Sequence, residues 1–288
     1  MKSTGVFILI FCFFFSVASA QKTDQRLYGS VVSLLKDFKG DAGVYIKNLK
    51  TGRSVAINAD SVFPTASIVK IPILIGIIDK ISRGELTYHQ ELIYKDSLLY
   101  AGSDILGSFK SNSSITLAKL VLLMLSTSDN TASLWLQSLA GTGTRINAIL
   151  DSAGYVFTRV NSRTPGRELF KSQFGWGQTT PAEMAGIVER IFRGKMITDS
   201  LSKRMVRLLG RNYWDEQAIS SIPPTVFVAS KNGAVDASRS EVLLVMAKQP
   251  YILSVFTKNN ADKSWGDDNE AWVLAKKLSA LVYSYYNR

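Results

Sequence analysis

The chain has 288 residues, of which 34 are Lys or Arg and 23 are Asp or Glu, so its formal net charge is +11. One Cys and one His exclude a disulfide framework and any metal site that needs several such ligands, and we expect no cofactor. No basic and aromatic pattern of the kind that binds nucleic acid is visible. The charge instead indicates an anionic neighbourhood, such as cell-wall polymer or anionic lipid, or a source that makes basic exported proteins.

The first twenty residues have the layout of a secretory signal peptide. Lys2 precedes an apolar run from Val6 to Val17, and Ala18-Ser19-Ala20 ends the segment with small residues. The run is too short to span a membrane. We therefore expect residues 1–20 to be removed during export. This leaves 21–288 as a single monomeric domain without a transmembrane segment, in the periplasm or outside the cell.

A helix and a hairpin open the mature chain. Residues 27–38 place apolar side chains on one stripe, which predicts an amphipathic helix. Residues 43–58 form two alternating segments around a turn in which Gly52 supplies positive φ, and they predict a β-hairpin. Lys50-Thr51-Gly52 is assigned to this turn rather than to a binding motif.

Ser67 and Lys70 mark the next element. Pro64 cannot extend a strand or continue a helix, and the apolar run from Ile68 to Ile78 predicts a buried helix that Ser67 opens. Lys70 lies three residues on, on the same helix face. A serine becomes a good nucleophile when a base takes its proton. A lysine serves as that base when burial and a nearby cation keep it neutral part of the time.

The segment Ser128-Asp129-Asn130 lies between two helical stretches. Residues 117–125 are apolar and helical before it, and residues 131–136 continue as a helix after it. Because Ser, Asp and Asn are all good N-caps, the segment also fits a plain helix start.

The C-terminal part predicts a helix, three strands and a last helix. Thr180-Pro181 supplies a cap and a first-turn proline for a helix that runs to 191. Lys231-Asn232-Gly233 follows the first strand, and Gly233 lets a ligand approach the backbone closely. The strands are expected at 226–229, 242–247 and 251–257, and the last helix at 269–286.

These elements predict an α/β (α+β) fold with two lobes. An isolated hairpin is barely stable, so the early pair and the late three strands should form one five-stranded antiparallel sheet, flanked by the N- and C-terminal helices. This sheet lobe comprises 21–62 and 220–288, and 63–219 form an all-helical lobe. The Ser67, Ser128 and Lys231 motifs then meet at the lobe junction, where clefts are common.

The order of Ser67-Ile-Val-Lys70, Ser128-Asp129-Asn130 and Lys231-Asn232-Gly233 resembles that of the penicillin-recognising serine hydrolases, most closely class A β-lactamases. The resemblance covers essentially the whole mature chain and implies a β-lactamase/transpeptidase-like fold. It gives Ser67 the role of nucleophile and Ser128 that of proton shuttle to the leaving nitrogen, with Lys70 as the base.

The resemblance also implies the substrate-binding residues. Asn130 would bind the substrate amide. The N–H groups of Ala234 and Ser67 would form an oxyanion hole, in which each donor is worth roughly 3–4 kcal/mol. Lys231 and Arg239 would bind the substrate carboxylate, with Asn232 and Gly233 completing the site. The alternative for Arg239 is a solvated cation at a strand end.

Two departures from the family pattern bear on turnover. The loop at 161–179 holds one carboxylate, Glu168, which the resemblance makes the candidate for activating the deacylating water. It lies nearer the following helix than the family spacing, and Ser172 and Gln178 stand where the family has Asn and Asp. A surface carboxylate is therefore the alternative. Asn232 replaces a Thr or Ser and cannot relay a proton as a hydroxyl does.

Three functions follow, in this order. The first is an exported serine hydrolase that opens β-lactams through an acyl-Ser67 intermediate. The second is a D-alanyl peptidase-like or other amide or ester hydrolase with weak lactam turnover. The third is a non-hydrolytic domain that binds lactams or the cell wall. The expected partner is a small β-lactam or a cell-wall peptide.

Overall fold

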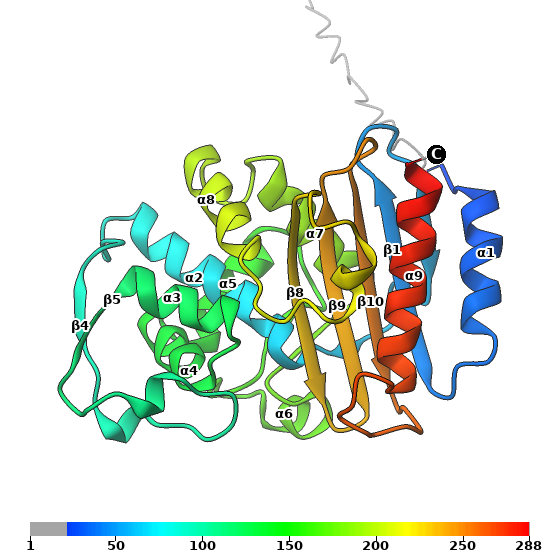
Figure 1. The fold of residues 1–288 in the computed structure, drawn as a ribbon. Coiled ribbons are helices and arrows are strands. Elements are labelled where there is room, and N and C mark those ends of the chain that lie inside the picture. Colours follow the sequence, from blue (N-terminus) through cyan, green and yellow to red (C-terminus); the bar gives the residue numbers. More distant parts are fainter. Residues whose placement is uncertain (1–21, 288) are drawn as a thin grey trace, which may run out of the picture.

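Strands from both ends of the chain lie side by side in one antiparallel sheet of order β2-β1-β10-β9-β8 (Figure 1). The computed structural model describes residues 22–287, so the expected signal peptide lies outside the described residues. The predicted five-stranded antiparallel sheet is confirmed. Its strands are β1 (Asp41–Asn48), β2 (Ser54–Ile57), β8 (Val228–Val235), β9 (Ser238–Val245) and β10 (Tyr251–Lys258).

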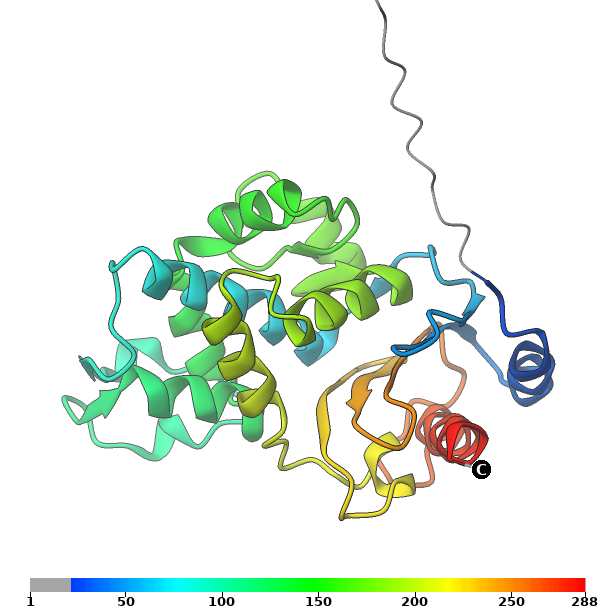
Figure 2. The same ribbon diagram turned by 90° about the horizontal axis from the view of Figure 1, so that it is seen from above.

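The two terminal helices, α1 (Gln25–Leu35) and α9 (Glu270–Tyr286), cover one face of the sheet, as predicted (Figures 1 and 2). Leu27 and Val31 of α1 are fully buried there together with Leu278 of α9. The Asp24 side chain caps α1 by accepting a hydrogen bond from the Leu27 amide at 3.3 Å. This layer isolates one face of the sheet from solvent.

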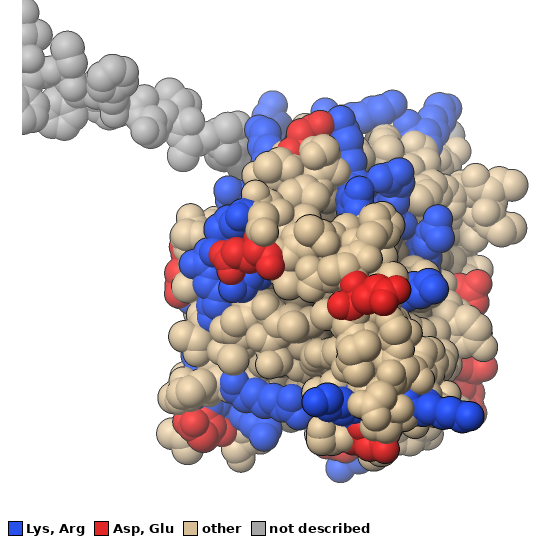
Figure 3. Space-filling model, turned by 90° about the vertical axis from the view of Figure 1, so that its left-hand side faces the viewer, with Lys and Arg blue, Asp and Glu red and all other residues tan. Residues whose placement is uncertain are grey.

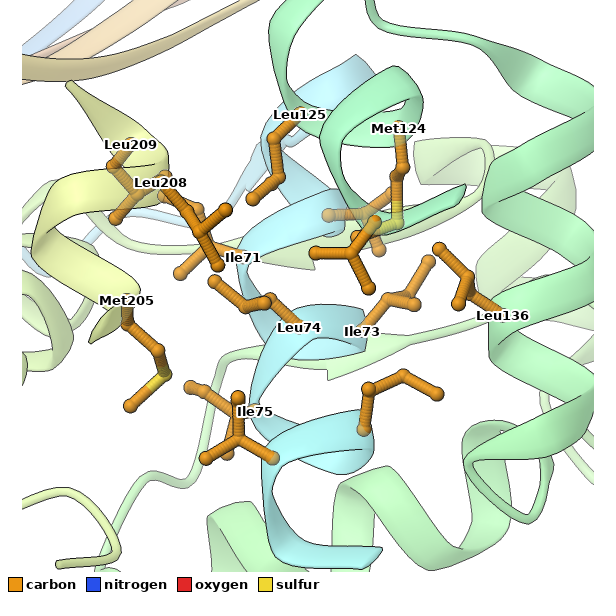
Figure 4. Close-up of a cluster of buried hydrophobic side chains, with 14 of the residues drawn as sticks. Ile71, Ile73, Leu74, Ile75, Met124, Leu125, Leu136, Met205, Leu208 and Leu209 are labelled. Atoms are coloured by element: carbon orange, nitrogen blue, oxygen red, sulfur yellow. The ribbon is translucent and has the colours of Figure 1, made fainter. Parts of the chain in front are cut away.

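The other face of the sheet packs against the helical lobe, which is built around α2 (Figure 2). Every residue from Ile68 to Ile78 is buried, which confirms the predicted buried helix. Figure 4 shows Ile71, Ile73, Leu74 and Ile75 of α2 pointing into a cluster with side chains of α3, α4 and α8. Each such fully buried side chain contributes roughly 1.5–3 kcal/mol. The lobe helices are α2 (Lys70–Ser82), α3 (Leu117–Ser126), α4 (Asn130–Leu139), α5 (Thr142–Ser152), α6 (Glu168–Phe174), α7 (Pro181–Phe192) and α8 (Asp199–Leu209).

The prediction that this lobe is all-helical was wrong. Two small antiparallel sheets and several 3₁₀ turns accompany the helices. Pairs of two or three residues leave no alternating pattern long enough to be recognised. The strands are β3 (Phe63–Pro64), β4 (Glu91–Ile93), β5 (Ser114–Thr116), β6 (Arg159–Val160) and β7 (Gly177–Thr179), and the turns are Ala66–Val69, Asp96–Leu98 and Leu106–Ser108. A further 3₁₀ turn, Ala218–Ser221, packs against α9 on the other side of the sheet.

Some predicted boundaries were also wrong. The strand expected at 226–229 runs to Val235, and β9 begins four residues before its expected start. Polar residues in both strands hid these extensions, because they are buried at the lobe junction instead of facing solvent. The helix expected at 27–38 ends at Leu35. Within residues 22–287, no helix is both long and apolar enough to cross a membrane.

Candidate active site

Ser67 lies in a tight 3₁₀ turn that leads directly into α2. The turn spans Ala66–Val69, and Ala66 has a positive φ of 43°. Ser67 thus precedes the α-helix. The prediction that Ser67 opens this helix was wrong. Pro72 lies in the first turn of α2, where its missing N–H costs little. The turn places the half-buried Ser67 at the lobe junction, and Lys70 is the first residue of α2.

Lys70 joins the first two motifs. Its ammonium donates to Ser67 Oγ at 3.0 Å and to Ser128 Oγ at 2.9 Å. It also lies 2.7 Å from the Ser128 carbonyl oxygen and 3.0 Å from Asn130 Oδ1. An ammonium has three protons for these four acceptors. The neutral amine would have a lone pair within reach of both hydroxyls.

The surroundings of Lys70 favour that neutral form. The side chain is fully buried, and this burial is the main reason that its pKa lies well below the usual range. The Lys231 ammonium lowers the pKa of Lys70 further, whereas the Asp129 carboxylate acts in the opposite direction. Both conditions that the sequence set for a lysine base, burial and a nearby cation, are therefore present.

The second motif is both a helix cap and part of the site. Asp129 Oδ1 caps α4 by accepting from the Ala132 amide at 2.7 Å, and Asp129 Oδ2 accepts from the Ile105 amide at 2.6 Å. Ser128 has a positive φ of 62°, which turns its hydroxyl back to Lys70. The alternatives weighed for this segment are thus not exclusive, because the cap fixes the turn that carries Ser128.

The third motif lies within β8, at the edge of the sheet next to Ser67. A Cβ on Gly233 would lie 2.6 Å from the Thr65 carbonyl oxygen and 2.9 Å from the Ser67 nitrogen. Only glycine therefore lets β8 approach the nucleophile this closely. The next residue, Ala234, lines the same cavity as Ser67. This placement is compatible with an oxyanion hole formed by the two N–H groups.

Lys231 is fully buried, and its ammonium donates to the backbone oxygen of Asn232 at 3.0 Å and to Asn232 Oδ1 at 3.1 Å. This contact leaves Asn232 Nδ2 as a donor for a ligand. Burial lowers the pKa of Lys231 to about 7, although the Glu241 carboxylate opposes the shift. Glu241 lies opposite Asn232 on β9, and burial raises its pKa to about 7. Its Oε2 accepts from the Ala218 amide at 2.8 Å, while its Oε1 has no partner.

Arg239 is buried in β9 and is not a solvated cation at a strand end. Its Nη1 donates to the carbonyl oxygens of Asp236 and Ser238, both at 2.9 Å. Its Nη2 donates to the carbonyl oxygen of Ser264 at 2.6 Å, and the guanidinium lies 4.5 Å from the centre of the Trp265 ring. Carboxylate binding by Arg239 stays a prediction. The contacts favour a role in positioning the loop that carries Trp265.

Glu168 is not brought to the Ser67 cluster. It begins α6, its side chain is exposed, and its Oε1 accepts from the Gly166 amide at 3.2 Å. It does not line the Ser67 cavity. Gln178, which stands where the family has Asp, still clamps the loop, because its Oε1 accepts from Arg167 Nη2 at 2.8 Å.

A cavity of about 320 Å³ joins Ser67, Ser128 and the β8 motif. Seven of the residues that line this cavity were not predicted from the sequence. Tyr213-Trp214-Asp215-Glu216 before β8 and Trp265 after β10 were the available signals, because both aromatic segments flank strands of the sheet that holds the third motif. The unpredicted lining residues are Ser103, Trp214, Glu216, Gln217, Trp265, Asp267 and Trp272. Within residues 22–287, no three His, Cys, Asp or Glu side chains are grouped as metal ligands would be.

Known proteins resemble the chain over almost all of its length. A model of the beta-lactamase enzyme family matches residues 26–286. The beta-lactamase VEB-1 of Pseudomonas aeruginosa is 22% identical over 300 residues, covering 98% of this chain and 97% of that protein.

Solved structures share the fold. A PBP-A mutant in an acyl-enzyme complex with penicillin G superposes with a TM-score of 0.81 at 22% identity, covering 92% of this chain and 98% of that one. A class A beta-lactamase from Bacteroides cellulosilyticus superposes with a TM-score of 0.79 at 20% identity, covering 91% and 98%. The fold implied by the order of the motifs is thereby confirmed.

Proposed function

Because the chain belongs to the beta-lactamase enzyme family, we propose that it is a serine hydrolase that opens β-lactam rings through an acyl-Ser67 intermediate. The observation that carries this proposal is the position of Lys70. One buried amine with a lowered pKa lies within 3.0 Å of Ser67 Oγ and 2.9 Å of Ser128 Oγ. That arrangement can take a proton from the first hydroxyl and return one through the second.

The acylation step follows from these contacts. Ser67 Oγ attacks the lactam carbonyl while its proton passes to the neutral Lys70 amine. The amides of Ser67 and Ala234 stabilise the negative charge that develops on the carbonyl oxygen. Collapse of the tetrahedral intermediate breaks the carbon–nitrogen bond. The leaving nitrogen then takes a proton from Ser128, which Lys70 replaces.

A second candidate, a D-alanyl peptidase-like enzyme with slow lactam turnover, rests on Glu168. Water must be activated to release the acyl group, yet the Glu168 carboxylate is exposed and bonded to the Gly166 amide. The PBP-A mutant, which was solved as an acyl-enzyme complex with penicillin G, shares the fold of this chain. That likeness supports the fold and does not decide between the two candidates. Both candidates share acylation of Ser67 and differ in the lifetime of the product.

Intact mass spectrometry over time after addition of penicillin tests both. The full mass of the antibiotic should add at one site. Ser67→Ala should remove the adduct, and Ser200→Ala, in another Ser-x-x-Lys segment on the exposed side of α8, should keep it. A short-lived adduct with product release supports the lactamase, and one that lasts for minutes or longer supports the peptidase-like enzyme. If no adduct forms, both candidate functions are contradicted.

We also propose that residues 1–20 direct export and that the enzyme acts outside the cytoplasm, on the strength of the small-residue segment Ala18-Ser19-Ala20. N-terminal sequencing of the exported protein should then begin at Gln21. A chain that keeps Met1 in the exported fraction would contradict this proposal.

A further inference from the structure

A second cavity, of about 360 Å³, lies on the helical lobe between α8 and α3, and no residue lines both this cavity and the one at Ser67. Four cations border it, and no carboxylate does. Arg204, Arg207 and Arg211 recur every three or four residues, so they share one face of α8 and its C-terminal extension, and Lys119 faces them from α3. Figure 3 shows Lys and Arg gathered over the upper part of this side of the molecule. We call this feature the α8 groove.

The charge of the α8 groove is not neutralised within the chain. None of its four cations has an ion-pair partner among residues 22–287, whereas other helical cations do. Lys203, on the same helix, lies 2.6 Å from Asp199, and Arg193 lies 2.8 Å from Glu189. Like charges one turn apart on a helix are mutually destabilising. Four like charges around one cavity would be stabilised by an anion that binds from outside the chain.

An aromatic ring and two leucine side chains line the groove together with the cations. The Arg204 guanidinium stacks over the Tyr88 ring at 4.1 Å from its centre, which fixes the plane of its N–H donors. A planar guanidinium binds a phosphate through two parallel hydrogen bonds. Leu122 and Leu208 line the groove with apolar surface. A bare ion would leave that surface uncovered.

We propose that the α8 groove binds a phosphate ester that carries an apolar group. The phosphate oxygens would contact Arg204, Arg207 and Arg211, and the first carbons of the ester would lie over Leu122 and Leu208. This binding site is separate from the Ser67 cavity and does not depend on the proposed hydrolase activity. The same chemistry is offered by a free phosphate ester and by the headgroup region of an anionic phospholipid.

Calorimetric titration of the purified protein with hexyl phosphate tests the site. Inorganic phosphate and hexanol serve as partial ligands, and each should bind more weakly. The combined variant Arg204→Gln, Arg207→Gln and Arg211→Gln should lose about tenfold or more in affinity for hexyl phosphate, because hydrogen bonds between charged groups are lost. Lys203→Gln removes one charge from the same helix, at a cation that is paired with Asp199 and does not line the groove, and should bind as the wild type does.

Two outcomes would overturn the proposal. Equal binding of hexyl phosphate by the triple variant and the wild type would remove the arginines from the site. Equal binding of inorganic phosphate and hexyl phosphate would show that the apolar group of the ester makes no contact with the groove. The circular dichroism spectrum and the urea denaturation midpoint, measured on the same samples, show whether the triple variant is folded, and neither depends on activity at Ser67.

Cosedimentation with vesicles separates the two sources of phosphate. If the ligand is a membrane headgroup, vesicles of phosphatidylglycerol should bind the wild type and vesicles of phosphatidylcholine should not. The triple variant should then lose on the order of 100-fold, since each basic residue near an anionic surface contributes about fivefold. Binding of hexyl phosphate without binding of vesicles assigns the groove to a free ester. Vesicle binding that survives in the triple variant, without binding of hexyl phosphate by the wild type, overturns the proposal.

Discussion

Gly233 and the backbone nitrogen of Ser67 are so close that a Cβ on Gly233 would lie 2.9 Å from that nitrogen. Because the second obstacle is the Thr65 carbonyl oxygen, which is also backbone, Gly233→Ala should push β8 away from Ser67. The amide of Ala234 would then no longer meet the developing oxyanion. We expect acylation by penicillin to slow by about 10²–10³-fold. Stopped-flow acylation measures this, and Gly29→Ala in α1, where nothing lies within 4 Å, is the control that should behave as the wild type does.

Lys70→Ala should slow acylation by at least roughly 10²-fold, and Ser128→Ala should do the same, because each removes one step of the proton path. In the wild type, the acylation rate should rise with pH as Lys70 loses its proton. Since the pKa of Lys70 is lowered by burial, the rate should level off well below the ordinary lysine value of about 10.4. A near-normal rate in either variant, with an unchanged circular dichroism spectrum, would remove that residue from the proton path.

The carboxylate-binding predictions for Lys231 and Arg239 can be separated with two substrates. Lys231→Ala should reduce capture of penicillin far more than capture of its neutral methyl ester, because the ammonium lies at Asn232 in the cavity wall. Arg239→Ala should reduce capture of both alike, because its N–H groups hold the carbonyl oxygens of the Ser264 loop. A selective loss of penicillin capture in Arg239→Ala would instead show that Arg239 binds the carboxylate.

Glu168→Gln tests whether the exposed carboxylate takes part in deacylation. Because Glu168 bonds the Gly166 amide and does not line the cavity, we expect unchanged rates of both acylation and release of the acyl group. Intact mass during turnover gives both rates. Normal acylation followed by a stalled adduct in the variant alone would place Glu168 at the deacylating water after all.

Glu241 should make stability depend on pH. Its pKa is 4.5 in the unfolded reference and about 7 when buried. The folded state therefore holds a proton that the unfolded state releases between these values. The stabilising contribution is complete below pH 4.5 and is lost as pH rises through 7. Glu241→Gln should abolish this loss and be more stable than the wild type above pH 7 by up to about 3 kcal/mol. Urea denaturation at several pH values measures the difference, and a constant difference would contradict the shift.

The sequence predicts well those parts of the fold in which local pattern and burial agree. The apolar run behind Ser67 and the Thr180-Pro181 start of α7 identify helices because each helix has a cap, a first-turn proline or a continuous apolar stretch. The cluster of Ser67, Lys70 and Ser128 was also accessible, since Ser67 and Lys70 are local neighbours and the order of the motifs implied the rest. Lys70 contacts both serine hydroxyls, as that order requires.

Features that depend on tertiary contact were not accessible. The β8 strand continues through Lys231 because the lobe junction buries a lysine, which no alternation rule anticipates. The guanidinium of Arg239 bonds carbonyl oxygens about 25 residues away in sequence, at Ser264, so its local context suggested only a cation near a strand end. The exposure of Glu168 follows from α6, a helix of 7 residues inside a segment expected to be a loop.

The positive φ values of Ala66 and Ser128, 43° and 62°, show that backbone strain is stored next to the proposed nucleophile and at the proposed proton shuttle. A side chain in the left-handed region costs on the order of 1–3 kcal/mol, and glycine relieves that cost. A library screened for thermal resistance alone should therefore favour Ser128→Gly, and with it the loss of the hydroxyl that we propose as the proton shuttle. Thermostable variants with full activity would have to gain their stability elsewhere, for example in the layer of α1 and α9.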